Sequence, residues 1–363
     1  ATGDNYLWIK GDSGKIQFNK VATVDDDGSW NDGNPYSDNN WDKDTKTYTN
    51  NTTLLSSEVN GKDRGYISYG LRLSGNLTDV NFVNNGSIIG AMEMKPQFNS
   101  LFSYRACNFC PRNCGADRTK QTGYCKSPSH ITAARAALHH WEEPCISGIR
   151  GSGTVFFSGC TLRCCFCQNY KISCEGYGKE ISPGRLCEIF LELQEQGAHN
   201  INLVTATQYL PSVLEALETA KKNLLIPVVY NCGGYETSET IGALSEYVDI
   251  WLPDLKYYSP ILSRQYSQAE DYFAVASHAV EQMIRLTGPP EFGEYKDKRS
   301  GTACSILRKG VIIRHMVLPG HKDDSIRLLY WMKDTLPKGG FLISLMSQYT
   351  PFYKAAEHGI GRR

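Results

Sequence analysis

The stretch Cys160-Thr161-Leu162-Arg163-Cys164-Cys165-Phe166-Cys167 is the most informative part of this sequence. Three of its cysteines, Cys160, Cys164 and Cys167, are spaced as C-x3-C-x2-C. A structural zinc site is normally closed by four ligands, so three thiolates in one loop are an unusual number. The spacing therefore favours a metal centre that keeps one coordination position open.

A four-iron cluster held by three thiolates has such an open position. S-adenosylmethionine can chelate the fourth iron through its amino and carboxylate groups. An electron from the cluster then cleaves the S–C5′ bond and releases a 5′-deoxyadenosyl radical. Phe166, directly before the last cysteine, is expected to lie against the adenine of this cofactor. The alternatives for the same spacing are a zinc knuckle or a chance clustering of cysteines.

The composition is that of a globular protein, and the 363 residues suggest about two domains. The 38 basic and 38 acidic residues balance, which argues against a nucleic-acid or membrane-surface partner. No apolar run approaches the ~18 residues needed to span a bilayer. All 13 cysteines lie between Cys107 and Cys304, an odd number in C-x2-C and C-x3-C groups. This usage is typical of metal ligands rather than disulfides and predicts a reducing, cytoplasmic location.

Residues 1–95 differ from the rest of the chain because they are rich in Asn, Asp, Gly, Ser and Thr and contain no cysteine. Short apolar or alternating runs, at residues 6–9, 67–73 and 80–83, stand between turn-forming clusters. This pattern predicts a small β domain or a partly disordered arm, and it resembles no family that we know.

Residues 96–150 are predicted to form a Cys-rich metal-binding segment followed by a helix. Four cysteines lie within 19 residues: Cys107, Cys110, Cys114 and Cys125. This density favours a compact tetrathiolate site, for zinc or for a second iron–sulfur cluster. The alternative is that only some of the four bind a metal. Alanine-rich sequence then predicts a helix over residues 130–143.

From residue 151 to residue 363 the pattern alternates between strands and helices. Strands are predicted at residues 154–157, 201–205, 226–230, 248–252, 311–317 and 341–346. Amphipathic helices are predicted between them, and the first begins with Ser182 as N-cap and Pro183 in its first turn. A polar segment at residues 289–308 is predicted to be a surface loop. Six βα units predict an α/β fold, a partial (β/α)6 TIM-like barrel.

In βα barrels the reactive groups gather where the strands end. Asp254 is expected to offset the sulfonium charge of the cofactor or to hold a small cation, and Arg314 or Lys256 to pair with its carboxylate. The ribose and the amino group are expected to bind the hydroxyl and amide groups of Thr205, Thr207 and Asn231. An Asp or Asn at a strand end is otherwise often a turn residue or a helix cap.

From about residue 104 to residue 351 the sequence resembles the radical SAM superfamily, and within it the pyruvate formate-lyase-activating-enzyme-like proteins of the PflX type. The motifs that carry the resemblance are CNFCPRNCGADR (107–118), HHWEEPCISG (139–148), GSGTVFFSGCTLRCCFCQNYKIS (151–173), GAHNINLVTATQYLP (197–211), YNCGGYE (230–236), DIWLPDLKY (249–257), IIRHMVLPG (312–320) and SLMSQYTP (344–351). They extend over about two-thirds of the chain.

The resemblance implies a 4Fe-4S cluster on Cys160, Cys164 and Cys167, with S-adenosylmethionine as co-substrate. It also implies an oxidoreductase whose radical abstracts hydrogen from a backbone glycine of a glycyl-radical enzyme. Such an activating enzyme receives its electron from a donor such as flavodoxin or ferredoxin.

The sequence departs from the family's pattern at four positions. Ala206 and Gln208 stand where the family usually has Pro and His, which puts the cofactor or substrate contacts of that loop in question. Cys165 replaces an apolar residue and is not counted as a ligand, and Cys232 replaces a small hydroxyl residue.

Two other functions are consistent with the sequence. Radical chemistry of the same kind can act on a small molecule or a peptide instead of a glycyl-radical enzyme. Alternatively, the chain is a non-catalytic protein in which both groups of cysteines bind zinc.

Overall fold

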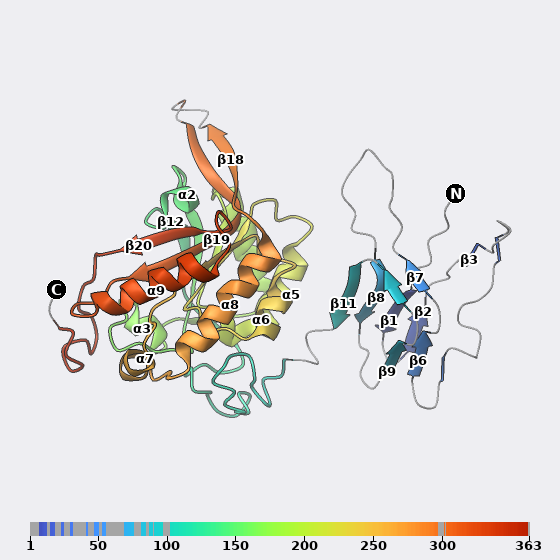
Figure 1. Ribbon diagram of the computed structural model, residues 1–363, viewed down its shortest axis with the longest axis horizontal. Helices are drawn as coiled ribbons and strands as arrows, with labels where there is room; N and C mark the ends of the chain where they lie inside the picture. The colour runs from blue at the N-terminus through green and yellow to red at the C-terminus, as the bar shows by residue number, and fades with distance from the viewer. Residues whose placement is uncertain are drawn as a thin grey trace. The chain divides into compact units, whose positions relative to one another are not determined.

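The chain is represented by a computed structural model that describes residues 102–296, 301 and 303–361 in full. Before residue 102 it describes the backbone of strands alone. The chain divides into two compact units, Ala1–Leu101 and Phe102–Arg363 (Figure 1). The Cys-rich segment belongs to the second unit, together with the large sheet.

In the first unit the described residues are all in β-strands. One sheet has the order β11-β8-β1-β2, from Ala91–Pro96, Tyr69–Gly75, Leu7–Asp12 and Lys15–Phe18. A second has the order β5-β6-β9, from Trp41–Asp42, Thr47–Asn50 and Asn81–Asn84. Two further pairs are β3 with β4 (Thr23–Val24, Trp30–Asn31) and β7 with β10 (Thr53–Leu55, Ser87–Ile89).

The second unit is built on a nine-stranded mixed sheet in the order β14-β12-β13-β15-β16-β17-β19-β18, with β20 also paired to β19. Six of these strands form one parallel ladder: β13 (Ser152–Phe157), β15 (Ile201–Val204), β16 (Val228–Cys232), β17 (Ile250–Pro253), β19 (Ala303–Met316) and β20 (Leu342–Met346). These are the six predicted strands, so the α/β fold with a parallel sheet is confirmed. Parallel neighbours bring all six carboxyl ends to one edge.

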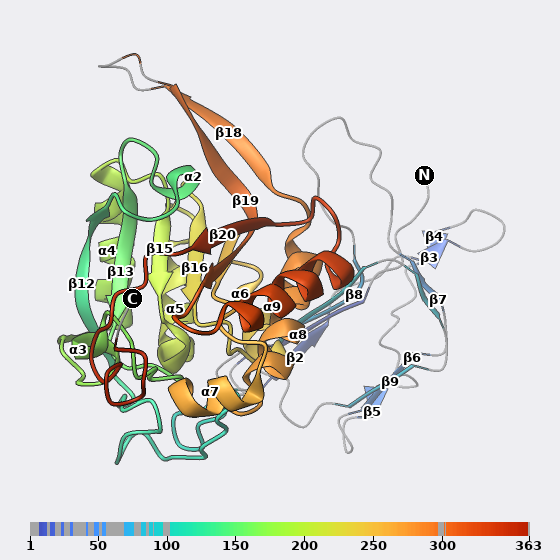
Figure 2. The ribbon, with the colours of Figure 1, turned by 60° about the vertical axis from the view of Figure 1, so that its left-hand side comes forward.

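Helices follow the parallel strands and cover the sheet (Figure 2). Their bounds are α2 Pro144–Ser147, α3 Tyr170–Ser173, α4 Pro183–Glu195, α5 Leu210–Ala220, α6 Ser238–Leu244, α7 Pro260–Ser267, α8 Tyr272–Thr287 and α9 Lys322–Thr335. The start of α4 is as predicted, because the Ser182 hydroxyl accepts a hydrogen bond from the Arg185 amide at 3.1 Å and Pro183 occupies the first turn. No helix among the described residues is long and apolar enough to cross a membrane.

The predicted helix over residues 130–143 is wrong. Ile131–His139 forms strand β12, which pairs antiparallel with β13 and with β14 (Lys179–Ile181). Alanine favours a helix over other residues by only a few tenths of a kcal/mol each, and pairing with an available sheet edge outweighs that preference.

The predicted surface loop at residues 289–308 is also wrong. It forms an antiparallel hairpin of β18 (Glu291–Lys296) with the first half of β19. The hairpin projects from the sheet in both ribbon views (Figures 1 and 2). Its residues alternate between exposed and half-buried along β18, so the polar composition reflects a solvated ribbon rather than a loop.

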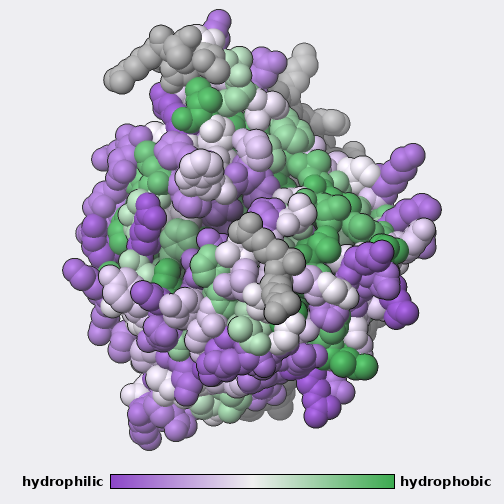
Figure 3. Space-filling model, turned by 90° about the vertical axis from the view of Figure 1, so that its left-hand side faces the viewer, coloured by the Kyte–Doolittle hydropathy of each residue, from purple (hydrophilic) through white to green (hydrophobic). Residues whose placement is uncertain are grey.

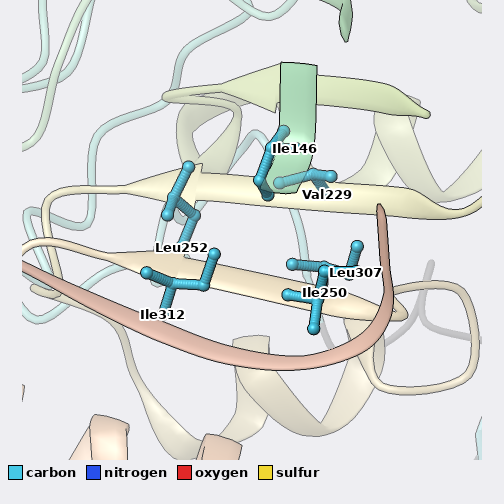
Figure 4. Packing of buried hydrophobic residues seen from close by; sticks show 6 residues of the cluster. All are labelled: Ile146, Val229, Ile250, Leu252, Leu307 and Ile312. Atoms are coloured by element: carbon cyan, nitrogen blue, oxygen red, sulfur yellow. The ribbon is translucent and has the colours of Figure 1, made fainter. Parts of the chain in front are cut away.

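The inner face of the sheet carries an apolar layer and then a polar one. The apolar layer is a cluster of buried side chains that includes Ile146 of α2, which points toward the strands in Figure 4: Ile146, Val229, Ile250, Leu252, Leu307 and Ile312. Two residues further along the same strands, the alternation of a β-strand places Asn231, Asp254 and Arg314 on the same face. The apolar layer therefore fills the space on this face of the sheet before the strands reach their carboxyl ends. The polar residues lie at those carboxyl ends.

On the face shown in Figure 3, hydrophilic residues predominate and hydrophobic residues gather in a band on the right of the view. Exposed large apolar side chains of the second unit include Ile343 and Leu345 on β20 and Ile326 on α9.

Candidate active site

The loop that carries the three spaced cysteines begins where β13 ends, at the carboxyl edge of the sheet. Arg163 in this loop has a φ of 53°, and Thr205 at the end of β15 has a φ of 58°. A positive φ is energetically costly for residues other than glycine, and such residues are concentrated at functional sites. Gln208 anchors the start of the loop, because its buried amide nitrogen lies 3.0 Å from the Ser158 carbonyl oxygen and 3.1 Å from that of Gly159.

Each of the three sulfurs has a hydrogen-bond donor. The hydroxyl of Ser267 lies 2.9 Å from the Cys164 Sγ, and that of Ser173 lies 3.2 Å from the Cys167 Sγ. The Leu162 amide lies 3.4 Å from the Cys160 Sγ. Hydrogen bonds of this kind support thiolate sulfurs in metal clusters and tune their potentials.

As free thiols, Cys160 and Cys167 hold their protons at neutral pH. Burial, together with the charge of the neighbouring Cys164 sulfur, raises the pKa of Cys160 to about 12 and that of Cys167 to about 11. Among the described residues no three His, Cys, Asp or Glu side chains are gathered tightly enough to chelate an ion. The donor set nevertheless fits an iron–sulfur cluster, because three mutually coupled thiols with hydrogen-bond donors share one loop.

The cysteine loop opens into a cavity of about 550 Å³. This volume is within the usual range for a small-molecule site. Its lining includes Cys164, Phe166 and Cys167 from the loop and Asp254, Lys256 and Arg314 from the strand ends. Two of the three spaced cysteines and all three charged residues expected at the site thus meet in one cavity.

Asp254 joins two cations at the base of this cavity. Its carboxylate accepts a hydrogen bond from the Arg314 Nε at 2.8 Å and another from the Lys256 Nζ. Arg314 also donates to the Asn231 Oδ1 at 2.7 Å and lies 3.5 Å from a carboxylate oxygen of Glu142. We call Asp254, Lys256 and Arg314 the charged triad.

The charged triad is fully ionised at neutral pH. Burial alone would raise the pKa of Asp254, but the charges of Arg314 and Lys256 outweigh it and lower that pKa. Burial would lower the pKa of Lys256 and Arg314, but the Asp254 carboxylate outweighs it and raises both. Glu142 also lies 3.5 Å from Arg314, so carboxylates on the protein balance the two cations, and Arg314 and Lys256 are the groups that can pair with an anionic group of a ligand.

The other residues predicted to bind the cofactor are Asn231, Thr205 and Thr207, and none of them lines the cavity. Asn231 is buried beside it through its bond to Arg314. Thr205 is half-buried and not among the lining residues, although its amide donates to the Asn231 carbonyl at 2.8 Å. Thr207 is buried outside the cavity, where its hydroxyl bonds Tyr230 and Glu236.

Sequence reasoning missed several lining residues. They are Gln168, Asn169, Met316, Leu318, Met346, Gln348, Thr350 and Phe352. Two signals were available. Gln168 and Asn169 directly follow the last cysteine, and Met316 lies two residues after Arg314, on the same face of β19 and in register with Met346 of β20.

Glu236 makes a pH-dependent contribution to stability that can be measured. Burial raises its pKa from 4.5 to about 8, although hydrogen bonds from Thr207 and Cys232 act in the opposite direction. The folded state therefore keeps a proton that the unfolded state loses between those two pH values. Stability should fall as pH rises through this window, by on the order of 1.4 kcal/mol per pH unit.

The measurement is the urea midpoint of wild type and Glu236→Gln at pH 5 and at pH 8.5. The wild type is expected to lose stability relative to the variant, because Gln does not titrate. An equal change in both proteins would show that Glu236 is not protonated in the folded state.

The four cysteines of the Cys-rich segment form a second group of neighbouring thiols. A Cβ on Gly123 would lie 3.4 Å from the Cys114 Sγ and 3.6 Å from the Cys125 Sγ, so these two sulfurs converge on one point. Arg118 Nη1 lies 3.6 Å from the Cys107 Sγ. Charge interactions also link the Cys110 thiol to Cys107 and Cys125.

Comparisons with known proteins find one matching family model and one similar curated protein. Residues 154–288 match the family model described as the Radical SAM superfamily, so this part of the chain is similar to proteins of that superfamily. A domain of this superfamily implies a 4Fe-4S cluster and the reductive cleavage of S-adenosylmethionine. The chain is 29% identical over 272 residues to the uncharacterized protein MJ0674 of Methanocaldococcus jannaschii, covering 72% of this chain and 71% of that protein.

Two solved structures are more distant. SuiB of Streptococcus suis has 13% identity and a TM-score of 0.36, over 56% of this chain and 41% of that one. Methylornithine synthase (PylB) has 16% identity and a TM-score of 0.38, over 55% of this chain and 53% of that one. Likeness at this level adds nothing to the assignment.

Proposed function

We propose that the cavity between the cysteine loop and the charged triad binds S-adenosylmethionine for radical chemistry. The observation that carries the proposal is that Cys164 and Cys167 line the same cavity as Asp254, Lys256 and Arg314. Cys160, Cys164 and Cys167 would hold a 4Fe-4S cluster, which when bound supplies the electron that cleaves S-adenosylmethionine.

The residues of the chain position the cofactor. Arg314 or Lys256 pairs with the methionine carboxylate. Asp254 limits the positive charge that the cationic sulfonium meets. Phe166 lies in the cavity wall, where its ring can pack against the adenine.

We further propose that the substrate is an uncharged stretch of polypeptide. Of the described residues that line the cavity, those outside the cysteine loop and the charged triad are apolar or neutral and polar. Met316, Met346 and Phe352 offer apolar surface, and Gln168 and Gln348 offer amide groups. Amide side chains pair with backbone amides, and these neutral lining residues offer no charged partner to a charged small molecule. A backbone glycine of a glycyl-radical enzyme, as the sequence resemblance implied, satisfies this description.

The test mixes anaerobic, reconstituted enzyme with S-adenosylmethionine, reduced flavodoxin or ferredoxin and a candidate glycyl-radical enzyme. The proposal predicts a glycyl EPR doublet on the partner. Formation of 5′-deoxyadenosine without a doublet on any such partner, together with turnover of a small molecule, would favour the alternative substrate class.

We propose in addition that Cys107, Cys110, Cys114 and Cys125 hold a metal, either zinc or a second iron–sulfur cluster. The supporting observation is Arg118, which is only 1% exposed. Its guanidinium donates to the carbonyl oxygens of Ser127, Gln208 and Pro128 and to the Cys107 thiol, and no ion pair among the described residues includes it. A buried cation needs a compensating negative charge, which a metal with four thiolates would supply.

Metal analysis after anaerobic purification tests both metal proposals together. Iron at the cysteine loop with zinc or further iron at the Cys-rich segment is expected. Two zinc ions and no iron would instead favour a non-catalytic zinc protein.

A further inference from the structure

Arg112 of the Cys-rich segment links that segment to the cysteine loop. Its Nε donates to the Thr161 carbonyl oxygen at 2.9 Å, inside the loop, and its Nη2 donates to the Ser267 carbonyl oxygen at 2.9 Å. Its Nη1 donates to the Gln268 carbonyl oxygen. Ser267 is the residue whose hydroxyl donates to the Cys164 sulfur. One guanidinium therefore holds the backbone of the loop and the backbone of a residue that contacts a cluster sulfur.

The position of the Arg112 side chain is itself fixed by aromatic rings. The guanidinium carbon lies 4.2 Å from the centroid of the Tyr124 ring and 5.2 Å from that of Tyr235. Tyr235 is held in turn by a 2.7 Å hydrogen bond from its hydroxyl to Asp271. Cation–π contacts of this kind orient a guanidinium, whose planar set of donors can then bind several acceptors at once.

A second line of contact runs beside the first. The Cys160 amide lies 3.3 Å from the Cys125 carbonyl oxygen. Gly159 has a φ of 85°, and a Cβ at this position would lie 2.0 Å from the Ser127 Oγ and 2.8 Å from the Cys125 carbonyl oxygen. The loop and the Cys-rich segment approach so closely here that a side chain does not fit.

We propose that Arg112 is a positioning residue for the cysteine loop, and that the Cys-rich segment serves as the surface against which this loop is held. Among the described residues, Arg112 bonds to none of the three sulfurs and does not line the cavity, so it acts through the backbone at Thr161 and Ser267. The proposal rests on the function proposed above. It explains why a segment outside the sheet is packed against the loop that carries the chemistry.

The test compares Arg112→Ala and Arg112→Lys with wild type as full-length protein. Lysine keeps the charge but loses the planar fork that bonds three carbonyl oxygens. Arg105→Ala is the matched control, because Arg105 lies in the same segment with an exposed side chain. The readouts are backbone hydrogen exchange over residues 158–168 without metal, the EPR spectrum and reduction potential of the reconstituted cluster, and KM and kcat for S-adenosylmethionine.

Arg112→Ala is expected to speed hydrogen exchange in residues 158–168 by about tenfold or more, since hydrogen bonds from a charged donor each contribute about 1.5–3 kcal/mol. It is also expected to shift the cluster's EPR signal and potential and to raise KM for S-adenosylmethionine by about tenfold. Arg112→Lys should be intermediate, and Arg105→Ala should match wild type.

Two outcomes would overturn the proposal. One is an Arg112→Ala protein with wild-type exchange, potential and KM. The other is faster exchange spread evenly over the whole unit, which would mean a general loss of stability. If the wild-type protein itself bound no cluster, the proposed function would fail, whereas the exchange measurement without metal would still test the role of Arg112.

Discussion

Replacing Cys164 by alanine is expected to abolish the cleavage of S-adenosylmethionine. Cys164 is the middle ligand of the proposed cluster, lines the cavity and receives the Ser267 hydroxyl at 2.9 Å. Two thiolates do not hold the cluster as three do, because the iron that loses its protein ligand is exposed to solvent and dissociates. We expect iron content to fall sharply and the formation of 5′-deoxyadenosine to drop below detection.

Cys165→Ala provides the matched control for this experiment. Cys165 is the adjacent thiol, buried like Cys164, but it falls outside the C-x3-C-x2-C spacing and the cavity lining. Its replacement should leave iron content and product formation close to wild type. Anaerobic, reconstituted Cys164→Ala that still formed 5′-deoxyadenosine would refute the ligand assignment.

The second large effect is expected from Asp254→Asn. This carboxylate is the shared partner of Lys256 and Arg314, and all three side chains are about four-fifths buried. Removing one partner of a buried ion pair leaves the remaining charges uncompensated and typically destabilises a protein by about 3–5 kcal/mol. We also expect a higher KM for S-adenosylmethionine, since two released cations would no longer be held in one geometry.

Urea denaturation and steady-state kinetics measure the two effects of Asp254→Asn. Asp323→Asn is the control, because Asp323 lies in the first turn of α9 with an exposed side chain. Surface substitutions of this kind usually change stability by less than about 0.5 kcal/mol. Equal stabilities and equal KM values for the two variants would mean that the charged triad is not the electrostatic centre of the site.

The fold was predictable where hydrophobic periodicity and tertiary structure agree. All six parallel strands were found because each is a short apolar run between turn signals. Ile131–His139 was missed because its alanines favour a helix locally, and only pairing with β13 makes it a strand. The hairpin of β18 with the first half of β19 was missed because a solvated ribbon has the composition of a loop.

The candidate site was predictable in its charged members and less so in its neutral ones. Asp254, Lys256 and Arg314 stand at strand ends, and parallel topology brings such ends together. Thr207 was expected in the cofactor site for the same reason, but a 3-10 turn after β15 directs it to Glu236 instead. The contacts of Arg112 could not be predicted from the sequence, because its acceptors are backbone oxygens 49 to 156 residues away in the chain.

EPR of the reduced, anaerobic protein with and without S-adenosylmethionine tests the central claim most directly. The account predicts a 4Fe-4S signal that changes when S-adenosylmethionine is added, since the cofactor would occupy the open coordination position beside Cys160, Cys164 and Cys167. A reduced protein without an iron–sulfur signal, or with a signal that S-adenosylmethionine leaves unchanged, would contradict it.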